Sequence, residues 1–161
     1  MNDLIADRAS AAPPNDMRVA IEFAIPSDVR YIERIVEQVS RQCADFAYPP
    51  SVCRLNVPVA LSEALSNAIL RANGQDASKQ VRVRATVDRV RLVLDVIDEG
   101  DGFDFDACMD DPTLPENLWR EDGRGLFLMR QLMDRVESFP ESDPAPGEER
   151  GNVVRLTISR A

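Results

Sequence analysis

One alternating run, at residues 80–98, constrains the fold more than any other feature of the sequence. The stretch QVRVRATVDRVRLVLDVID alternates apolar with polar side chains, and its first apolar set is Val81, Val83, Ala85 and Val87. A period of two predicts two strands, and the short turn around Asp88 and Arg89 predicts that they pair as an antiparallel hairpin. One face of this hairpin is apolar, so a second layer has to cover it.

The other elements supply both layers. Residues 18–26 alternate and predict a first strand, while VESF and NVVRLTISR predict two more strands on either side of a loop at 140–151. Helices are predicted at 27–46, 59–72 and roughly 124–135. The first of them is expected to be capped by Ser27 and to bury the stripe Val29, Ile32, Val36, Val39 and Cys43.

This element order predicts an α+β fold, a two-layer sandwich of a mixed, mostly antiparallel sheet with helices on one face. The start of the second helix stays open, because Pro58 either lies in its first turn or kinks a longer helix. A long loop at 98–125 is expected to be a functional lid or mobile. Residues 1–16 are rich in Ala, Pro and Asp and predict a disordered tail ahead of a single domain at 17–161.

Composition excludes several classes of function. The 161 residues carry a net charge of −9 with a pI near 4.6, which disfavours direct binding to nucleic acid or to an anionic membrane. No stretch reaches the roughly 20 apolar residues of a membrane span, no secretory signal is visible, and the three cysteines form no CxxC pair. A cytoplasmic protein is therefore expected. The chain has no histidine, which excludes Ser-His and Cys-His catalysis and an internal phosphohistidine.

Three short motifs carry candidate chemistry, and the first is LSEALSNAI. Glu63 and Asn67 stand four residues apart and so share one face of a helix. An Asn side-chain oxygen suits Mg²⁺, and a Glu one turn away can accept a proton from a hydroxyl or a water that attacks a phosphate. Two polar residues on the wet side of an amphipathic helix explain this motif equally simply, and taken alone it favours that explanation.

The second motif is the acidic, glycine-rich stretch DEGDGFD, which follows the predicted strand end. Asp98 can accept a hydrogen bond from an amino group such as that of adenine, and Gly100 and Gly102 let the backbone approach a ligand. A calcium loop is excluded, because Gly100 and Gly102 occupy the third and fifth positions, where an EF-hand needs oxygen ligands. A polar turn after an edge strand remains an equal alternative for this motif in isolation.

The third motif is GRGLFLM. Gly123 and Gly125 flank Arg124 directly before the predicted helix, and a helix N-terminus with unpaired N–H groups favours phosphate. Arg124 adds a charged donor. A flexible linker that ends at a helix start explains the same residues, and a lone GxG is weak evidence.

Together, the order and setting of the three motifs resemble the Bergerat (GHKL) ATP-binding fold. Residues 63–68 resemble its N box, 98–102 its G1 box and 123–126 its G2 box. The segments ALSEALSNAI, DEGDGFD, GRGLFLMRQLMD and GNVVRLTI, within residues 17–160, are most similar to the bacterial anti-sigma factor serine/threonine-protein kinases (RsbW/SpoIIAB-like). Two departures are visible: Arg71-Ala72 stands where His-Ala is common, and Pro58 lies in the N-box helix.

The resemblance implies ATP and Mg²⁺ as cofactors and gives the residues roles. Glu63 is implied as general base, and the remaining candidates bind the nucleotide and its metal: Asn67 (also the Mg²⁺ ligand), Asp98 (reading adenine), Gly100, Gly102, Gly123, Arg124, Gly125 and Leu126.

The implied function is sequestration of a sigma factor and phosphorylation of a Ser or Thr of a STAS-type anti-anti-sigma protein. A homodimer is also implied, with the first strand and helix as the expected contact. Three alternatives stay open. The chain is a nucleotide-binding sequestration module without kinase activity, a phospho-switch kinase acting on another regulator, or a detached histidine-kinase catalytic domain that needs a histidine from another protein.

Overall fold

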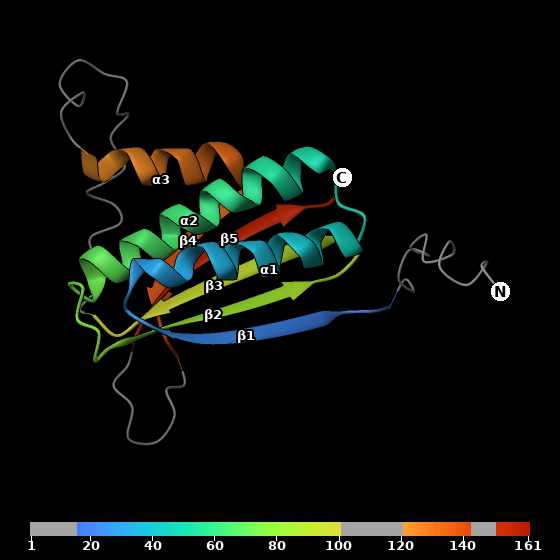
Figure 1. The fold of residues 1–161 in the computed structure, drawn as a ribbon. Coiled ribbons are helices and arrows are strands. Elements are labelled where there is room, and N and C mark those ends of the chain that lie inside the picture. The colour runs from blue at the N-terminus through green and yellow to red at the C-terminus, as the bar shows by residue number, and fades with distance from the viewer. Residues whose placement is uncertain (1–15, 101–120, 143–150) are drawn as a thin grey trace, which may run out of the picture.

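The computed structural model describes residues 16–100, 121–142 and 151–161, and its centre is one five-stranded antiparallel sheet (Figure 1). In sheet order the strands are β1 (Val19–Pro26), β2 (Gln80–Val87), β3 (Arg91–Asp98), β5 (Asn152–Ser159) and β4 (Arg135–Pro140). Every neighbouring pair is antiparallel. The predicted hairpin is confirmed, because β2 pairs with β3 from Arg82 opposite Ile97 to Val87 opposite Leu92.

The helices lie together on one face of this sheet (Figure 1). They are α1 (Ile32–Asp45), α2 (Val57–Asn67) and α3 (Glu121–Leu132), with a short 3₁₀ turn η1 (Val29–Tyr31) and two π-helical turns, η2 (Val52–Asn56) and η3 (Ala68–Ala72). The predicted α+β class, two-layer arrangement and element order are confirmed. None of the described helices combines the length and the apolar character that crossing a membrane requires.

The first helix differs in detail from its prediction. Asp28 rather than Ser27 is the cap, and it caps the 3₁₀ turn η1 that leads into α1 by accepting the Arg30 N–H at 2.9 Å. Ser27 is buried and donates its hydroxyl to the Ile69 carbonyl at 3.4 Å. Val29 is 47% exposed, so it lies outside the buried stripe, where Ile35 takes its place. The tighter 3₁₀ turn changes the helical phase and rotates Val29 away from the core.

Pro58 lies within a longer helical stretch that begins before the predicted start at residue 59. The π turn η2 leads into α2, and the Val57 N–H reaches back five residues to the Val52 carbonyl. In a regular helix the Pro58 ring would clash with the carbonyl four residues earlier and would leave it without a donor. The wider π turn at this point accommodates the proline without ending the helix.

The third helix begins at Glu121, which is earlier than predicted. Gly123 and Gly125 therefore lie inside α3 rather than ahead of it, and the last five residues of the predicted loop at 98–125 are helical. Leu126 and Met129 are fully buried in the hydrophobic core, which stabilises this helix despite the low helix propensity of glycine. Residues 101–120, including Gly102, and the predicted tail up to Asn15 lie outside the described residues.

Candidate functional site

The helix α2 presents Glu63 and Asn67 on one face, one turn apart. Both side chains are partly buried, whereas Leu61 and Leu65 of the same helix are fully buried in the core. The apolar side of α2 thus fixes the helix against the sheet, and this orientation determines where the carboxylate and the carboxamide lie.

Gly125 of α3 lies directly against this pair. A β-carbon placed on Gly125 would collide with Oε2 of Glu63, 3.3 Å from Glu63 Cδ and 3.8 Å from Nδ2 of Asn67. Gly125 therefore leaves room for the Glu63 carboxylate between the two helices, in the place that a side chain would otherwise occupy. The structure therefore brings the first and third predicted motifs together, although 58 residues separate Asn67 from Gly125 in the chain.

Asp98, at the end of β3, is a buried carboxylate with 3% exposure. Its Oδ1 accepts hydrogen bonds from the Gly100 N–H at 2.9 Å and from Nδ2 of Asn152 at 3.4 Å. Burial raises the pKa of Asp98, and these hydrogen bonds act in the opposite direction without cancelling the effect of burial. A carboxylate held in this way is a fixed acceptor at the strand end.

Gly100 connects the second motif to the first. A β-carbon on Gly100 would run into the carbonyl oxygen of Ala72, the last residue of η3. Because η3 continues the helical stretch that carries Asn67, the Asp98–Gly100 turn lies at one end of that stretch. Five residues separate Asn67 from Ala72, about 7–8 Å along a helix axis.

The geometry of the third motif corrects one prediction. In a helix that starts at Glu121, the unpaired N–H groups belong to the first four residues, whereas Gly125 and Leu126 lie where intrahelical bonding begins. The phosphate cradle predicted just ahead of the helix is therefore part of its first turns. The Arg124 side chain is exposed.

Comparison with known proteins shows which family the chain belongs to. The profile of the histidine kinase-like ATPase domain matches residues 25–158. The serine-protein kinase RsbW of Bacillus subtilis (strain 168) is 34% identical over 121 residues, which cover 72% of this chain and 75% of that protein. RsbW of Bacillus licheniformis is 38% identical over 121 residues, with the same two shares. The chain belongs to the RsbW serine-protein kinase family, within the histidine kinase-like ATPases. The predicted resemblance is confirmed.

Sequence reasoning overlooked three residues near the RsbW-type site. Asn73 and Asn152 both hydrogen-bond to the Asp98–Gly100 turn, and a β-carbon on Gly151 would collide with the Asp98 carbonyl. Gly151 and Asn152 stand in the segment GNVVRLTI, which carried part of the resemblance but suggested no role. Asn73 follows directly after Arg71-Ala72, where the sequence departs from the family, and only the fold reveals its partners.

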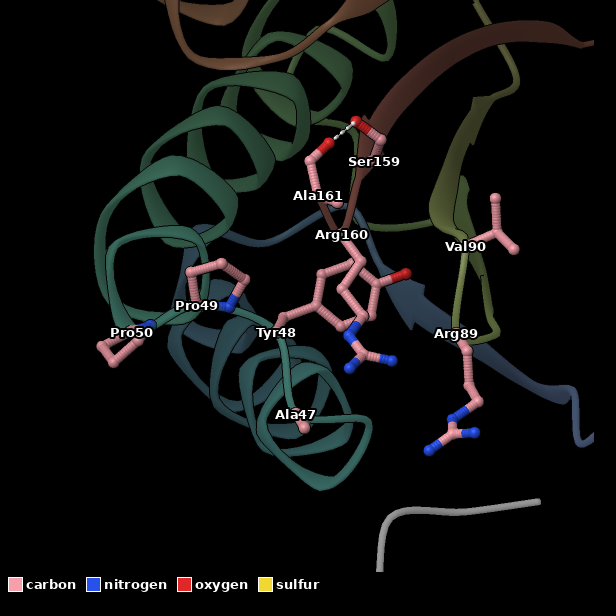
Figure 2. Close-up of a pocket in the computed structure, with 9 residues that line it drawn as sticks. All are labelled: Ala47, Tyr48, Pro49, Pro50, Arg89, Val90, Ser159, Arg160 and Ala161. Atoms are coloured by element: carbon pink, nitrogen blue, oxygen red, sulfur yellow. Dashed lines mark hydrogen bonds between the residues drawn. The ribbon is translucent and has the colours of Figure 1, made fainter. Parts of the chain in front are cut away.

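The structure contains a cavity away from the predicted site residues (Figure 2 shows its lining). Its volume is about 670 Å³, and it is lined by the α1–α2 connection, the β2–β3 turn and residues 159–161. Tyr48, Arg89 and Arg160 contribute its larger side chains. It opens at the end of the sheet where β3 begins, whereas Asp98 ends that strand about 23 Å away. No predicted site residue lines it.

Proposed function

We propose that the chain is an ATP-dependent serine/threonine-protein kinase and an anti-sigma factor. In this proposal it sequesters a sigma factor and phosphorylates a Ser or Thr of a STAS-type anti-anti-sigma protein. The observation that carries the proposal is the packing of Gly125 against Glu63 and Asn67, with the turn after Asp98 packed beside the end of the helical stretch that carries them. The names of the RsbW relatives support the kinase activity.

Asp98 and the turn after it form the adenine end of the proposed site. The buried carboxylate accepts a hydrogen bond from the exocyclic amine of adenine, and a base with a carbonyl oxygen in place of that amine would be repelled. Gly100 lets this turn pack directly on η3, because any side chain there would collide with the Ala72 carbonyl. Gly102 is assigned to the same end by family resemblance alone.

Asn67 and Glu63 form the phosphate end. Mg²⁺ prefers oxygen ligands and keeps several waters, so one carboxamide oxygen from Asn67 together with substrate phosphates fits its demands. Among the described residues there is no group of three or more acidic, Cys or His side chains to hold a metal without the nucleotide. When bound, Mg²⁺ neutralises charge on the phosphates. The N–H groups of Gly123 and Arg124, in the first turn of α3, and the Arg124 side chain contact those phosphates, while Gly125 and Leu126 hold α3 in place against α2.

Glu63 is the proposed general base. Its carboxylate accepts the proton of the substrate hydroxyl as that oxygen forms its bond to the γ-phosphorus, and the bond from the γ-phosphorus to ADP breaks. The phosphorylated antagonist gains about two negative charges at neutral pH. A chain of net charge −9 repels it, so the antagonist is released and the sigma factor is sequestered again.

Two further parts of the proposal concern assembly and setting. The chain forms a homodimer in which β1, at the edge of the sheet, and α1 make the contact. It acts in the cytoplasm as one domain over residues 17–161. The dimer is expected from the family resemblance, whereas the cytoplasmic setting is expected from the composition of the chain. Cross-linking with mass analysis tests the dimer directly.

The decisive experiment is phosphoryl transfer from γ-labelled ATP to candidate antagonists. Wild type is expected to label a Ser or Thr, and Glu63→Gln, of nearly equal size, is expected to abolish labelling while ATP still binds. Native-lysate capture followed by mass spectrometry supplies the candidates. Bound ATP with no transfer to any captured antagonist would refute the kinase activity and favour a nucleotide-binding sequestration module.

A further inference from the structure

Asn73 joins three elements at the adenine end of the proposed site. It is 2% exposed and follows η3, where its own N–H donates to the Ala68 carbonyl at 2.9 Å. Its Oδ1 accepts the Glu99 N–H at 2.9 Å, and its Nδ2 donates to the Gln80 carbonyl at 3.1 Å. One carboxamide thus ties the end of the helical stretch to the start of β2 and to the turn after β3.

Asn152 holds the same turn from the other side. It stands opposite Asp98 in the β3–β5 register, and its Nδ2 donates to the Gly100 carbonyl at 2.8 Å and to Asp98 Oδ1 at 3.4 Å. The Gly100 N–H also reaches Oδ1. These side-chain and turn contacts fall on one oxygen of the carboxylate, and a carboxylate has a second oxygen to offer a ligand.

Close backbone contacts leave the turn little room to shift. A β-carbon on Gly100 would collide with the Ala72 carbonyl, and one on Gly151 would collide with the Asp98 carbonyl and lie 3.3 Å from Cγ2 of Ile97. The turn is therefore packed between η3 and the start of β5. Hydrogen bonds from both sides then fix its rotation as well as its position.

We propose that Asn73 and Asn152 are positioning residues for adenine recognition, which clamp the Asp98–Gly100 turn so that Oδ2 of Asp98 accepts the exocyclic amine. This inference rests on the proposed function. An acceptor that is already held in the binding orientation discriminates between bases, because binding adenine requires no reorganisation of the carboxylate. A carboxylate that can rotate freely adapts to adenine and to other bases alike. The clamp therefore sets the preference for adenine over a base with a carbonyl at that position.

The test compares binding of ATP and inosine triphosphate, which carries an oxygen in place of the amine. Calorimetric titrations use wild type, Asn73→Ala and Asn152→Ala. Each variant is expected to lose about tenfold in the ratio of ATP to inosine triphosphate affinity, which corresponds to one hydrogen bond of ordinary strength. Asn152→Ala, whose side chain is less deeply buried, carries the test where Asn73→Ala does not fold.

Asn56→Ala is the matched control. Asn56 also donates one side-chain hydrogen bond to a backbone carbonyl, that of Leu132 at 2.7 Å, but it joins η2 to α3 instead of the adenine end. It is expected to lower the melting temperature without changing the nucleotide ratio. A ratio that stays at the wild-type value in the Asn73 and Asn152 variants while ATP still binds overturns this inference alone. Absence of ATP binding by wild type overturns the proposed function, and the inference with it.

Discussion

Gly125→Ala is expected to separate catalysis from stability. The new β-carbon would occupy the place of Glu63 Oε2 and approach Glu63 Cδ to 3.3 Å. What it meets is the far end of a flexible side chain, so Glu63 can swing aside while the helices keep their positions. The proposed general base then no longer lies where the substrate hydroxyl needs it.

The energies of the two effects differ in sign. Ala is favoured over Gly inside a helix by about 1 kcal/mol. Moving Glu63 off its preferred rotamer costs about 0.5–1.5 kcal/mol, so the net change in the free energy of unfolding is within about 1 kcal/mol. For a chain of this size that shifts the melting temperature by no more than about 4 °C. Displacing a catalytic base by about 1 Å costs on the order of 100-fold in rate.

The assay is single-turnover transfer of labelled phosphate to the antagonist, measured beside a thermal melt of the same preparation. Gln131→Ala, on an exposed position of α3, is the control and is expected to leave both quantities unchanged. Transfer by Gly125→Ala within threefold of the wild-type rate would refute the placement of Glu63. A large fall in melting temperature would refute the claim that the Glu63 side chain moves aside while the helix backbones keep their positions.

Three further predictions follow from buried charge. Burial raises the pKa of Asp98 in the fold, so its ionisation lowers the stability of the protein at neutral pH. Asp98→Asn is therefore expected to have a melting temperature at pH 7 no lower than that of wild type. Its affinity for ATP is expected to fall at least tenfold, because an amide donor replaces the acceptor. The stabilisation of wild type by protonated Asp98 is present at low pH and lost as the pH rises through the raised pKa. In a series of melts at falling pH, the difference in melting temperature between Asp98→Asn and wild type should therefore narrow, while ATP binding by wild type weakens. A difference that stays constant with pH would contradict a raised pKa of Asp98. Arg155→Ala strips the buried Asp95 of two hydrogen bonds of 2.7 and 2.9 Å and is expected to cost about 1–3 kcal/mol in a denaturant titration, with partial recovery when Asp95 is also replaced by Ala.

The sheet was readable from the sequence because its pattern has a strict period. Alternation over residues 80–98 fixed both strands and their turn, and Asp88 closes that turn by accepting the N–H groups of Val90 and Arg91. Helix phases were less certain. A single 3₁₀ turn was enough to move Val29 out of the stripe, and a periodic pattern does not reveal such local changes of pitch.

The site was predictable only as separate motifs. Spacing placed Glu63 and Asn67 on one face, but their contact with Gly125 depends on how α3 packs, which no local pattern states. The predicted start of α3 was wrong because the prediction relied on the low helix propensity of glycine, which the burial of Leu126 in the folded protein overrides. Asn73 left no signal, since the partners of its side chain are backbone groups at the start of β2 and in the turn after β3.

Calorimetric titration of the wild-type chain with ATP in the presence of Mg²⁺ tests the central claim most directly. The account predicts saturable binding at one site per chain, weakened when Mg²⁺ is withheld from wild type and insensitive to Mg²⁺ in Asn67→Ala. Glu63→Gln should bind as wild type does. No heat of binding with Mg²⁺ present, or equal Mg²⁺ dependence in wild type and Asn67→Ala, would contradict the claim that these residues form a single Mg·ATP pocket.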